Sequence, residues 1–164
     1  MTYDRRPPSG GPRGSDRPAP APVASIDNTQ VKLGADDMPE LLFADIAQAA
    51  ARTIAEAGKN KFTGRLEKNK PSQLRKFYDE LVMWHDRVAF EKTADARAAK
   101  YRELAPFIKM MNAKVAYARG RGHVDQNFEQ LFSHLIRQIA CPATLKNAKL
   151  FMEAVLGFLK AEEK

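Results

Sequence analysis

Apolar residues recur at steps of three and four along most of this chain, which is the spacing of one face of an α-helix. The first such stretch begins at Asp37 and Glu40, which have the spacing of a capping box, and stops at Gly58. The second follows Ser72, a candidate N-cap. The apolar positions of the two stretches are Leu41, Leu42, Ile46, Ala50 and Ile54, and then Leu74, Phe77, Tyr78, Leu81, Val82 and Val88.

Three further helical stretches follow toward the C-terminus. The first of them, residues 95–118, contains Pro106, so we expect a kink or a break there, and Gly120 ends it. Its apolar positions are Tyr101, Leu104, Phe107, Ile108, Met111 and Val115. Asp125 and Thr144 are candidate caps of the last two stretches. Since no segment alternates with period two, the pattern predicts an all-α fold, a compact bundle of about five helices over residues 36–164.

Residues 1–35 differ in composition from the rest. They are rich in Pro, Gly and Arg, and they offer too little apolar surface to offset the entropy lost on ordering. The sequence therefore predicts a disordered N-terminal tail over this range. Two roles remain open for it, a flexible arm that touches RNA or a dispensable extension.

Charge and cysteine content narrow the class of protein. The formal net charge is +7 and the pI is near 9.6, which favours polyanionic partners such as RNA or DNA. Cys141 is the only cysteine, so the chain has no internal disulfide. Its apolar runs fall short of the roughly 20 residues of a membrane span, and its N-terminus lacks the apolar core of a signal peptide. We therefore expect a cytoplasmic protein without a membrane association.

Candidate catalytic chemistry is missing from the sequence. His85, His123 and His134 form no pair at the spacing of metal ligands on a helix, and there is no phosphate-binding loop. Trp84 is expected to pack in the core rather than to stack on a base. The sequence therefore predicts that the protein is not an enzyme and holds neither a cofactor nor a metal.

The positive charge is concentrated in two segments. Residues 57–76 carry seven basic residues and a single acidic one, and residues 104–124 carry four basic residues and no acidic one. If the segments lie together, they form a surface suited to salt-sensitive, sequence-independent contact with phosphates. A solvated face that aids solubility is the alternative. The aromatic residues lie at core spacing, so an exposed stacking platform is not expected.

Three local patterns together resemble the small subunit of type III-A CRISPR (Csm) effector complexes. The sequence SQLRKFY at residues 72–78 is similar to the Ser/Thr-Gln-Ile-Arg-Lys-Phe/Tyr helix start of that family. KVAYARGR at residues 114–121 is similar to its Lys-x-x-Tyr-Ala-x-x-Arg segment. FMEAV at residues 151–155, with FLKA at 158–161, is similar to its closing Phe-x-Glu-Ala helix. The order and spacing of the three patterns make the resemblance fairly specific.

The resemblance implies a helical, non-catalytic subunit present in several copies that stack beside the backbone subunits. In that family the copies line the channel that holds guide RNA paired with target RNA, so the implied partners are these RNAs, the backbone and large subunits, and copies of the chain itself. It makes Arg75, Arg119 and Arg121 the best candidates for phosphate contact. The residues that could join them are Lys70, Lys76, Lys109 and Lys114.

Several alternatives remain open from the sequence. Arg75 could pair with Asp79 one helical turn away, and Tyr117 is expected to pack in the core. The chain as a whole could be a helical DNA-binding regulator, although no polar recognition helix is evident. It could also be a purely structural interaction protein that touches no nucleic acid.

Overall fold

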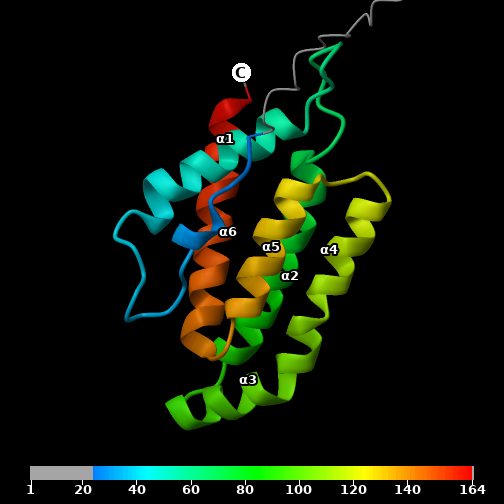
Figure 1. Cartoon of the computed structure of the whole chain (residues 1–164). Helices are drawn as coiled ribbons and strands as arrows, with labels where there is room; N and C mark the ends of the chain where they lie inside the picture. The colour runs from blue at the N-terminus through cyan, green and yellow to red at the C-terminus, as the bar shows by residue number, and fades with distance from the viewer. Residues whose placement is uncertain (1–23, 164) are drawn as a thin grey trace, which may run out of the picture.

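The computed structural model describes residues 24–163, and its regular elements there are helical (Figure 1). The α-helices are α1 (Ala47–Ala57), α2 (Pro71–Ala89), α3 (Ala94–Lys109), α4 (Met111–Gly120), α5 (Gln126–Gln138) and α6 (Pro142–Glu162). A short 3-10 helix, Asn28–Gln30, and a π-helical turn, Leu42–Ile46, precede α1. Within the described range the strand-like pairing is an isolated bridge between Lys59 and Leu66. The all-α prediction is confirmed.

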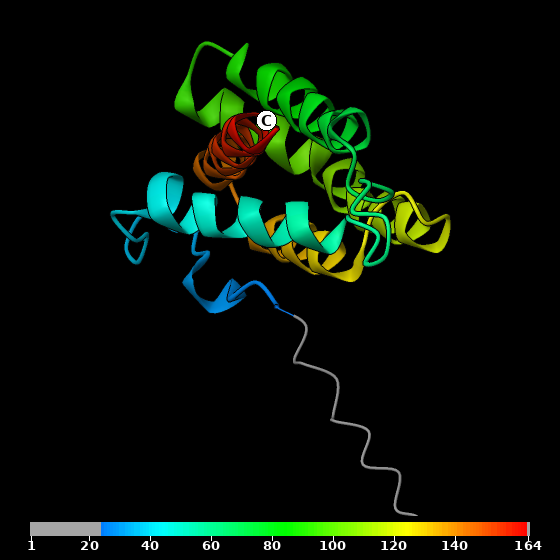
Figure 2. The same cartoon turned by 90° about the horizontal axis from the view of Figure 1, so that it is seen from above.

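The helices pack as a bundle with two crossing elements. In Figure 1, α2, α4, α5 and α6 run roughly alongside one another, while α3 crosses one end of the bundle. Helix α1 lies across α6, and the view from above shows the two helices side by side (Figure 2). Helix α6 packs on α1 and α2, and α4 packs on α5. The starts of α2 and α5 and the end of α4 therefore lie at the same end of the bundle.

The core follows the predicted apolar faces closely. Leu74, Leu81 and Val88 of α2 are buried, as is Trp84, which stacks on Phe107 with the ring centroids 6.1 Å apart. The expectation that Trp84 packs is thus confirmed. Many of the other large buried side chains come from α2, α5 and α6, and they include Phe77, Phe128, Phe132, Leu131, Leu135, Phe151 and Met152. None of the described helices is long and apolar enough to cross a membrane.

Local capping explains where several helices begin. Asp125 caps α5 as predicted, because its carboxylate accepts a hydrogen bond from Phe128 N at 3.1 Å. Helix α2 begins instead at Pro71, one residue before the predicted cap Ser72, because the fixed φ of proline suits the first helical position. Likewise Thr144 does not precede α6. It lies inside the first turn, and its hydroxyl accepts a hydrogen bond from Cys141 N at 3.1 Å.

The start of the first helical region was predicted incorrectly. No side chain caps the π-helical turn, so Asp37 and Glu40 do not form the expected capping box. Ala44 has φ −116° and ψ −105°, which is outside the helical region, and regular α-helix begins only at Ala47. Leu41, which was assigned to the buried face, is exposed.

The predicted third helix is divided at Met110. One turn after Pro106 the chain leaves α3, turns at Met110 and continues as α4 in a new direction (Figure 1). The predicted break is confirmed. Phe107, however, is half exposed although its spacing placed it on the core face. Because the chain changes direction between α3 and α4, the apolar residues of this stretch do not form one continuous buried face, and Phe107 lies outside the buried part.

Part of the predicted N-terminal tail belongs to the folded domain. Residues 24–35 were assigned to the tail, yet Val31 and Leu33 are fully buried. Side chains of α5 and α6 satisfy the backbone of this segment: Gln138 and His134 bond to Val31 O, and Asn147 donates to Leu33 O at 2.8 Å. The segment is thus held on the domain by two buried apolar residues and three polar side chains, and not by the hydrogen bonds of a long helix. Residues 1–23, the remainder of the predicted tail, lie outside the described residues.

Candidate nucleic-acid interface

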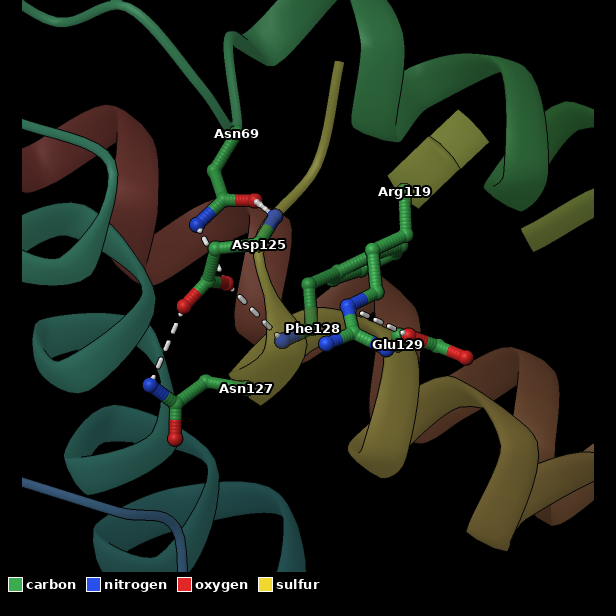
Figure 3. Close-up of polar contacts among 6 residues, drawn as sticks. All are labelled: Asn69, Arg119, Asp125, Asn127, Phe128 and Glu129. Carbon is green, nitrogen blue, oxygen red and sulfur yellow. Dashed lines mark hydrogen bonds and ion pairs between the residues drawn. The ribbon is translucent and has the colours of Figure 1, made fainter. Parts of the chain in front are cut away.

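A buried polar junction joins the two basic segments of the chain (Figure 3). Asn69, just before α2, donates to Asp125 Oδ1 at 2.8 Å and accepts from Asp125 N at 2.9 Å. Its backbone N–H donates to His123 O at 2.9 Å, and its amide also donates to Ile54 O at 3.0 Å. Asn69 is only 2% exposed, so these groups have few other partners. The junction therefore holds the start of α2 beside the loop between α4 and α5.

The backbone at the junction explains why asparagine is suitable there. Asn69 has φ +57°, the left-handed region that asparagine tolerates better than most residues with a side chain. On the other side of the loop, a Cβ at Gly58 would lie 2.2 Å from Lys68 O. Position 58 therefore requires glycine for a close approach of two backbone segments. Together these residues return the chain from α1 to α2 in a defined path.

The first two turns of α2 carry three predicted site residues. Lys70, Arg75 and Lys76 are exposed, and none of them forms an ion pair with any carboxylate in residues 24–163. In particular Arg75 does not pair with Asp79, which had been the structural alternative for it. The first turn of α2 contains no acidic residue, and no side chain caps it. The positive end of the helix dipole thus adds to the side-chain charges.

Arg119 and Arg121 lie at the end of α4, beside the same junction. Arg119 Nε is 3.0 Å from Glu129 Oε2, a close ion pair with α5 (Figure 3). Glu129 Oε2 is buried, and this ion pair neutralises part of the charge of Arg119. Arg121 is exposed and has no acidic partner among the described residues. Its guanidinium lies 6.0 Å from the ring centroid of Tyr117.

Tyr117 contradicts the expectation that it packs in the core. Its side chain is 66% exposed, on the face of α4 that carries Arg121. Phe62, in the loop before α2, is 98% exposed. The expectation that the aromatic residues lie at core spacing is therefore wrong at these positions. The pattern of α4 did not reveal this because residues three and four apart share a face whether that face is covered or bare.

The two remaining lysines are engaged elsewhere. Lys114, midway along α4, bonds to Glu80 of α2 at 2.5 Å. Lys109, at the end of α3, donates to the carbonyl oxygens of Ile136 and Ile139 at 2.6 and 2.5 Å. It therefore satisfies the last turn of α5, and burial lowers the pKa of its ammonium group.

The seven predicted phosphate-binding residues therefore do not lie in one place. Lys70, Arg75 and Lys76 lie at the start of α2, and Arg119 and Arg121 lie at the end of α4. Both helix ends belong to the end of the bundle where α5 begins (Figure 1). Lys109 lies at the opposite end of α4, a helix of 10 residues. That length corresponds to about 15 Å of rise. Lys109 therefore contributes to the packing of α3 on α5. We call the end of the bundle where α2 begins and α4 ends the basic end, and define it by Lys70, Arg75, Lys76, Arg119 and Arg121.

Sequence reasoning missed Asn69, which organises this end. It lies between two lysines in a polar stretch, and nothing in its neighbours indicates a partner 56 positions away. The Asn side chain does favour left-handed turns, which is the single local signal for its conformation.

In the described residues, no group of three or more His, Cys, Asp or Glu side chains is placed to hold a metal ion.

Comparison with known proteins assigns the chain to a family. A family model described as Csm2 Type III-A matches residues 44–164, which is most of the chain and all of α1 to α6. Searches of curated proteins and of solved structures give no significant match. The matched range includes the junction at Asn69 and Asp125 and all five residues of the basic end. The chain therefore belongs to the Csm2 Type III-A family, the small subunit of the type III-A Csm complex, and associates with other subunits of that complex.

Proposed function

We propose that this small subunit binds guide and target RNA through backbone phosphates at the basic end, without reading sequence and without a catalytic step. The observation that carries the proposal is the junction of Asn69 with Asp125, which places the unpaired charges of Arg75 and Arg121 at the same end of the bundle. Phosphate contact needs cations that are accessible and not already neutralised. Lys70, Arg75, Lys76 and Arg121 meet that condition.

The arrangement also supports a contact that is indifferent to sequence. The charges project from helix ends and loops, whereas readout of bases in a duplex needs a recognition helix whose side chains reach base edges. The basic end is made of the N-terminus of α2 with its first two turns and the C-terminus of α4, and not of one long exposed helix face. Copies of the chain stacked along one RNA would each supply such an end. Copies of the chain itself are therefore part of the proposal as partners in the assembled complex.

Salt-dependent binding of the purified full chain to RNA tests the proposal. Wild type and an Arg75→Gln, Arg121→Gln double variant are compared on two unrelated single-stranded RNAs over a range of salt concentrations. Wild type is expected to bind both RNAs with similar affinity and with a negative slope of log K against log salt. The variant should flatten that slope by about 1.4, which is about 0.7 for each lost contact on a single strand.

A matched control separates a local contact from a general charge effect. Arg102 and Lys146 are exposed cations outside the basic end, on α3 and α6. Neutralising these two residues changes the net charge equally, so an equal loss of slope would contradict a localised site. A preference for one duplex DNA sequence would favour the helical regulator instead. Unchanged binding in the Arg75 and Arg121 variant, or none in wild type, would favour a purely structural subunit.

A further inference from the structure

Phe62 is the most exposed large apolar side chain of the described chain, at 98%. It lies in the loop of residues 59–68, which rises above the basic end between α1 and α2 (Figure 1). An isolated exposed apolar residue is common on protein surfaces and by itself supports no function. This loop is well defined by its contacts, so the position of the ring matters.

Asn60 organises the turn that presents Phe62. Its side-chain oxygen accepts hydrogen bonds from Phe62 N at 2.8 Å and from Thr63 N at 3.1 Å. Its backbone N–H donates to Arg65 O at 2.8 Å, and its backbone oxygen accepts from Gly64 N at 2.9 Å. Gly64 adopts φ +68°, which closes the turn. These hydrogen bonds define the backbone of the turn that carries Phe62, whose ring is exposed to solvent.

The base of the loop is also secured. Gly58 O accepts hydrogen bonds from Glu67 N at 2.9 Å and from Lys68 N at 3.0 Å. Asn60 Nδ2 donates to Glu67 Oε1 at 2.9 Å, which occupies the single carboxylate of the loop. A turn fixed at both its tip and its base loses little entropy when a ligand binds to it.

The charges around Phe62 are those of a phosphate-binding surface. Lys61, Arg65 and Lys68 are exposed, and none forms an ion pair with a carboxylate that the structure describes. An aromatic ring among free cations is the combination that single-stranded nucleic acids require, since cations follow the phosphates and the ring stacks on a base. A protein partner with an apolar docking surface would instead favour neutral neighbours around the ring.

We propose that Phe62 stacks on an unpaired base of the RNA whose phosphates contact the basic end. The inference rests on the proposed function and adds a base contact to it. Within a duplex, the faces of the bases are covered by neighbouring pairs, so a ring at a rigid tip reaches a base face at unpaired nucleotides or at a strand end. Stacking tolerates every base, which keeps the contact independent of sequence.

The test compares RNA strands with and without bases. The full chain is titrated with a fluorescently labelled single-stranded RNA and with an oligomer of equal length that is abasic throughout. The proteins are wild type, Phe62→Leu, Phe62→Trp and Phe90→Leu. Phe90 is a matched control because it is 83% exposed but follows α2 at its far end, beside Glu91. Position 62 makes no side-chain contact that folding requires, and circular dichroism verifies each variant.

Phe62→Leu is expected to weaken binding of the base-containing strand about tenfold, the effect of losing one stacked base. Its binding to the abasic strand should match wild type, and its salt slope should not change because no charge is removed. Phe62→Trp should bind as wild type, and Phe90→Leu should have no effect.

Three results would overturn the inference while leaving the phosphate contact intact. One is equal binding of wild type and Phe62→Leu to the base-containing strand, and the others are an equal loss on both strands and an equal loss for Phe90→Leu. If wild type binds neither strand, the proposed function itself fails, and the stacking contact fails with it.

Discussion

Asn69 and Asp125 exchange two hydrogen bonds, of 2.8 and 2.9 Å, across 56 positions of the chain. The carboxylate of Asp125 at the same time caps α5 by accepting from Phe128 N. One carboxylate therefore both begins a helix and anchors the loop that precedes α2. Because Lys70 follows Asn69 directly and Arg121 lies shortly before Asp125, this pair determines how the cations of α2 and α4 are placed relative to each other.

Substitution of Asn69 should reveal two separate contributions to stability. Asn69→Gly keeps the backbone at φ +57° but leaves buried partners without hydrogen bonds, and we expect a loss of about 2–3 kcal/mol in the free energy of unfolding. Asn69→Ala loses the same bonds and adds left-handed strain of about 1 kcal/mol. Urea denaturation measures both values. Equal urea midpoints for Asn69→Gly and Asn69→Ala would contradict the predicted contribution of left-handed strain.

Leu33→Ala should destabilise the domain although the sequence assigned that residue to the tail. Leu33 is fully buried, so we expect a loss of about 2–5 kcal/mol in the free energy of unfolding. Its exposed neighbour provides the control, since Lys32→Ala should change stability by no more than about 0.5 kcal/mol. Thermal and urea unfolding measure the difference. If the two variants are equally stable, residues 24–35 do not belong to the folded domain.

Lys109→Met should reduce stability without affecting RNA binding. The variant keeps an apolar stem but removes the donor to Ile136 O and Ile139 O, which we expect to cost about 1–2 kcal/mol. Its salt slope with RNA should equal that of wild type, because Lys109 lies away from the basic end. A flatter slope at unchanged stability would instead return Lys109 to the RNA site.

The same lysine predicts a pH dependence whose sign is defined. Burial lowers the pKa of Lys109 in the folded state below its ordinary value of 10.5. Between the two pKa values the unfolded chain binds more protons, so the contribution of this group to stability rises as the pH increases toward 10.5. The difference in unfolding free energy between wild type and Lys109→Met should therefore grow over that window. Urea titrations at several alkaline pH values measure it, and a shrinking difference would contradict the direction.

Glu80→Gln should strengthen RNA binding if phosphates reach the middle of α4. Glu80 neutralises Lys114, and removing the carboxylate charge leaves that cation available. We expect the salt slope to become steeper by about 0.7, the value for one more contact on a single strand. Glu103→Gln is the control for net charge: it removes the closer of the two carboxylates that pair with Lys100 on α3, leaves Glu91 in place, and should not change the slope. An equal effect of both variants would indicate a general response to net charge.

Much of the architecture could be predicted from the sequence because its signals are local. The periodicity of Leu74, Leu81 and Val88, the break after Pro106 and the cap at Asp125 depend on residues within one or two turns of each other. Errors occurred where a distant contact replaced a local one. Residues 24–35 have no helical pattern and are held instead by polar side chains of α5 and α6.

The candidate site shows the same division between local and distant causes. The sequence by itself determined that the chain is helical, that its cations concentrate in two segments, and that three of its patterns resemble a family that the family match then confirmed. Only the tertiary structure decided which cations are free. Lys114 pairs with a residue 34 positions away, and Lys109 meets carbonyl groups 27 and 30 positions away. Whether a charge faces solvent depends on which helix packs beside it, and that is a property of the folded chain as a whole.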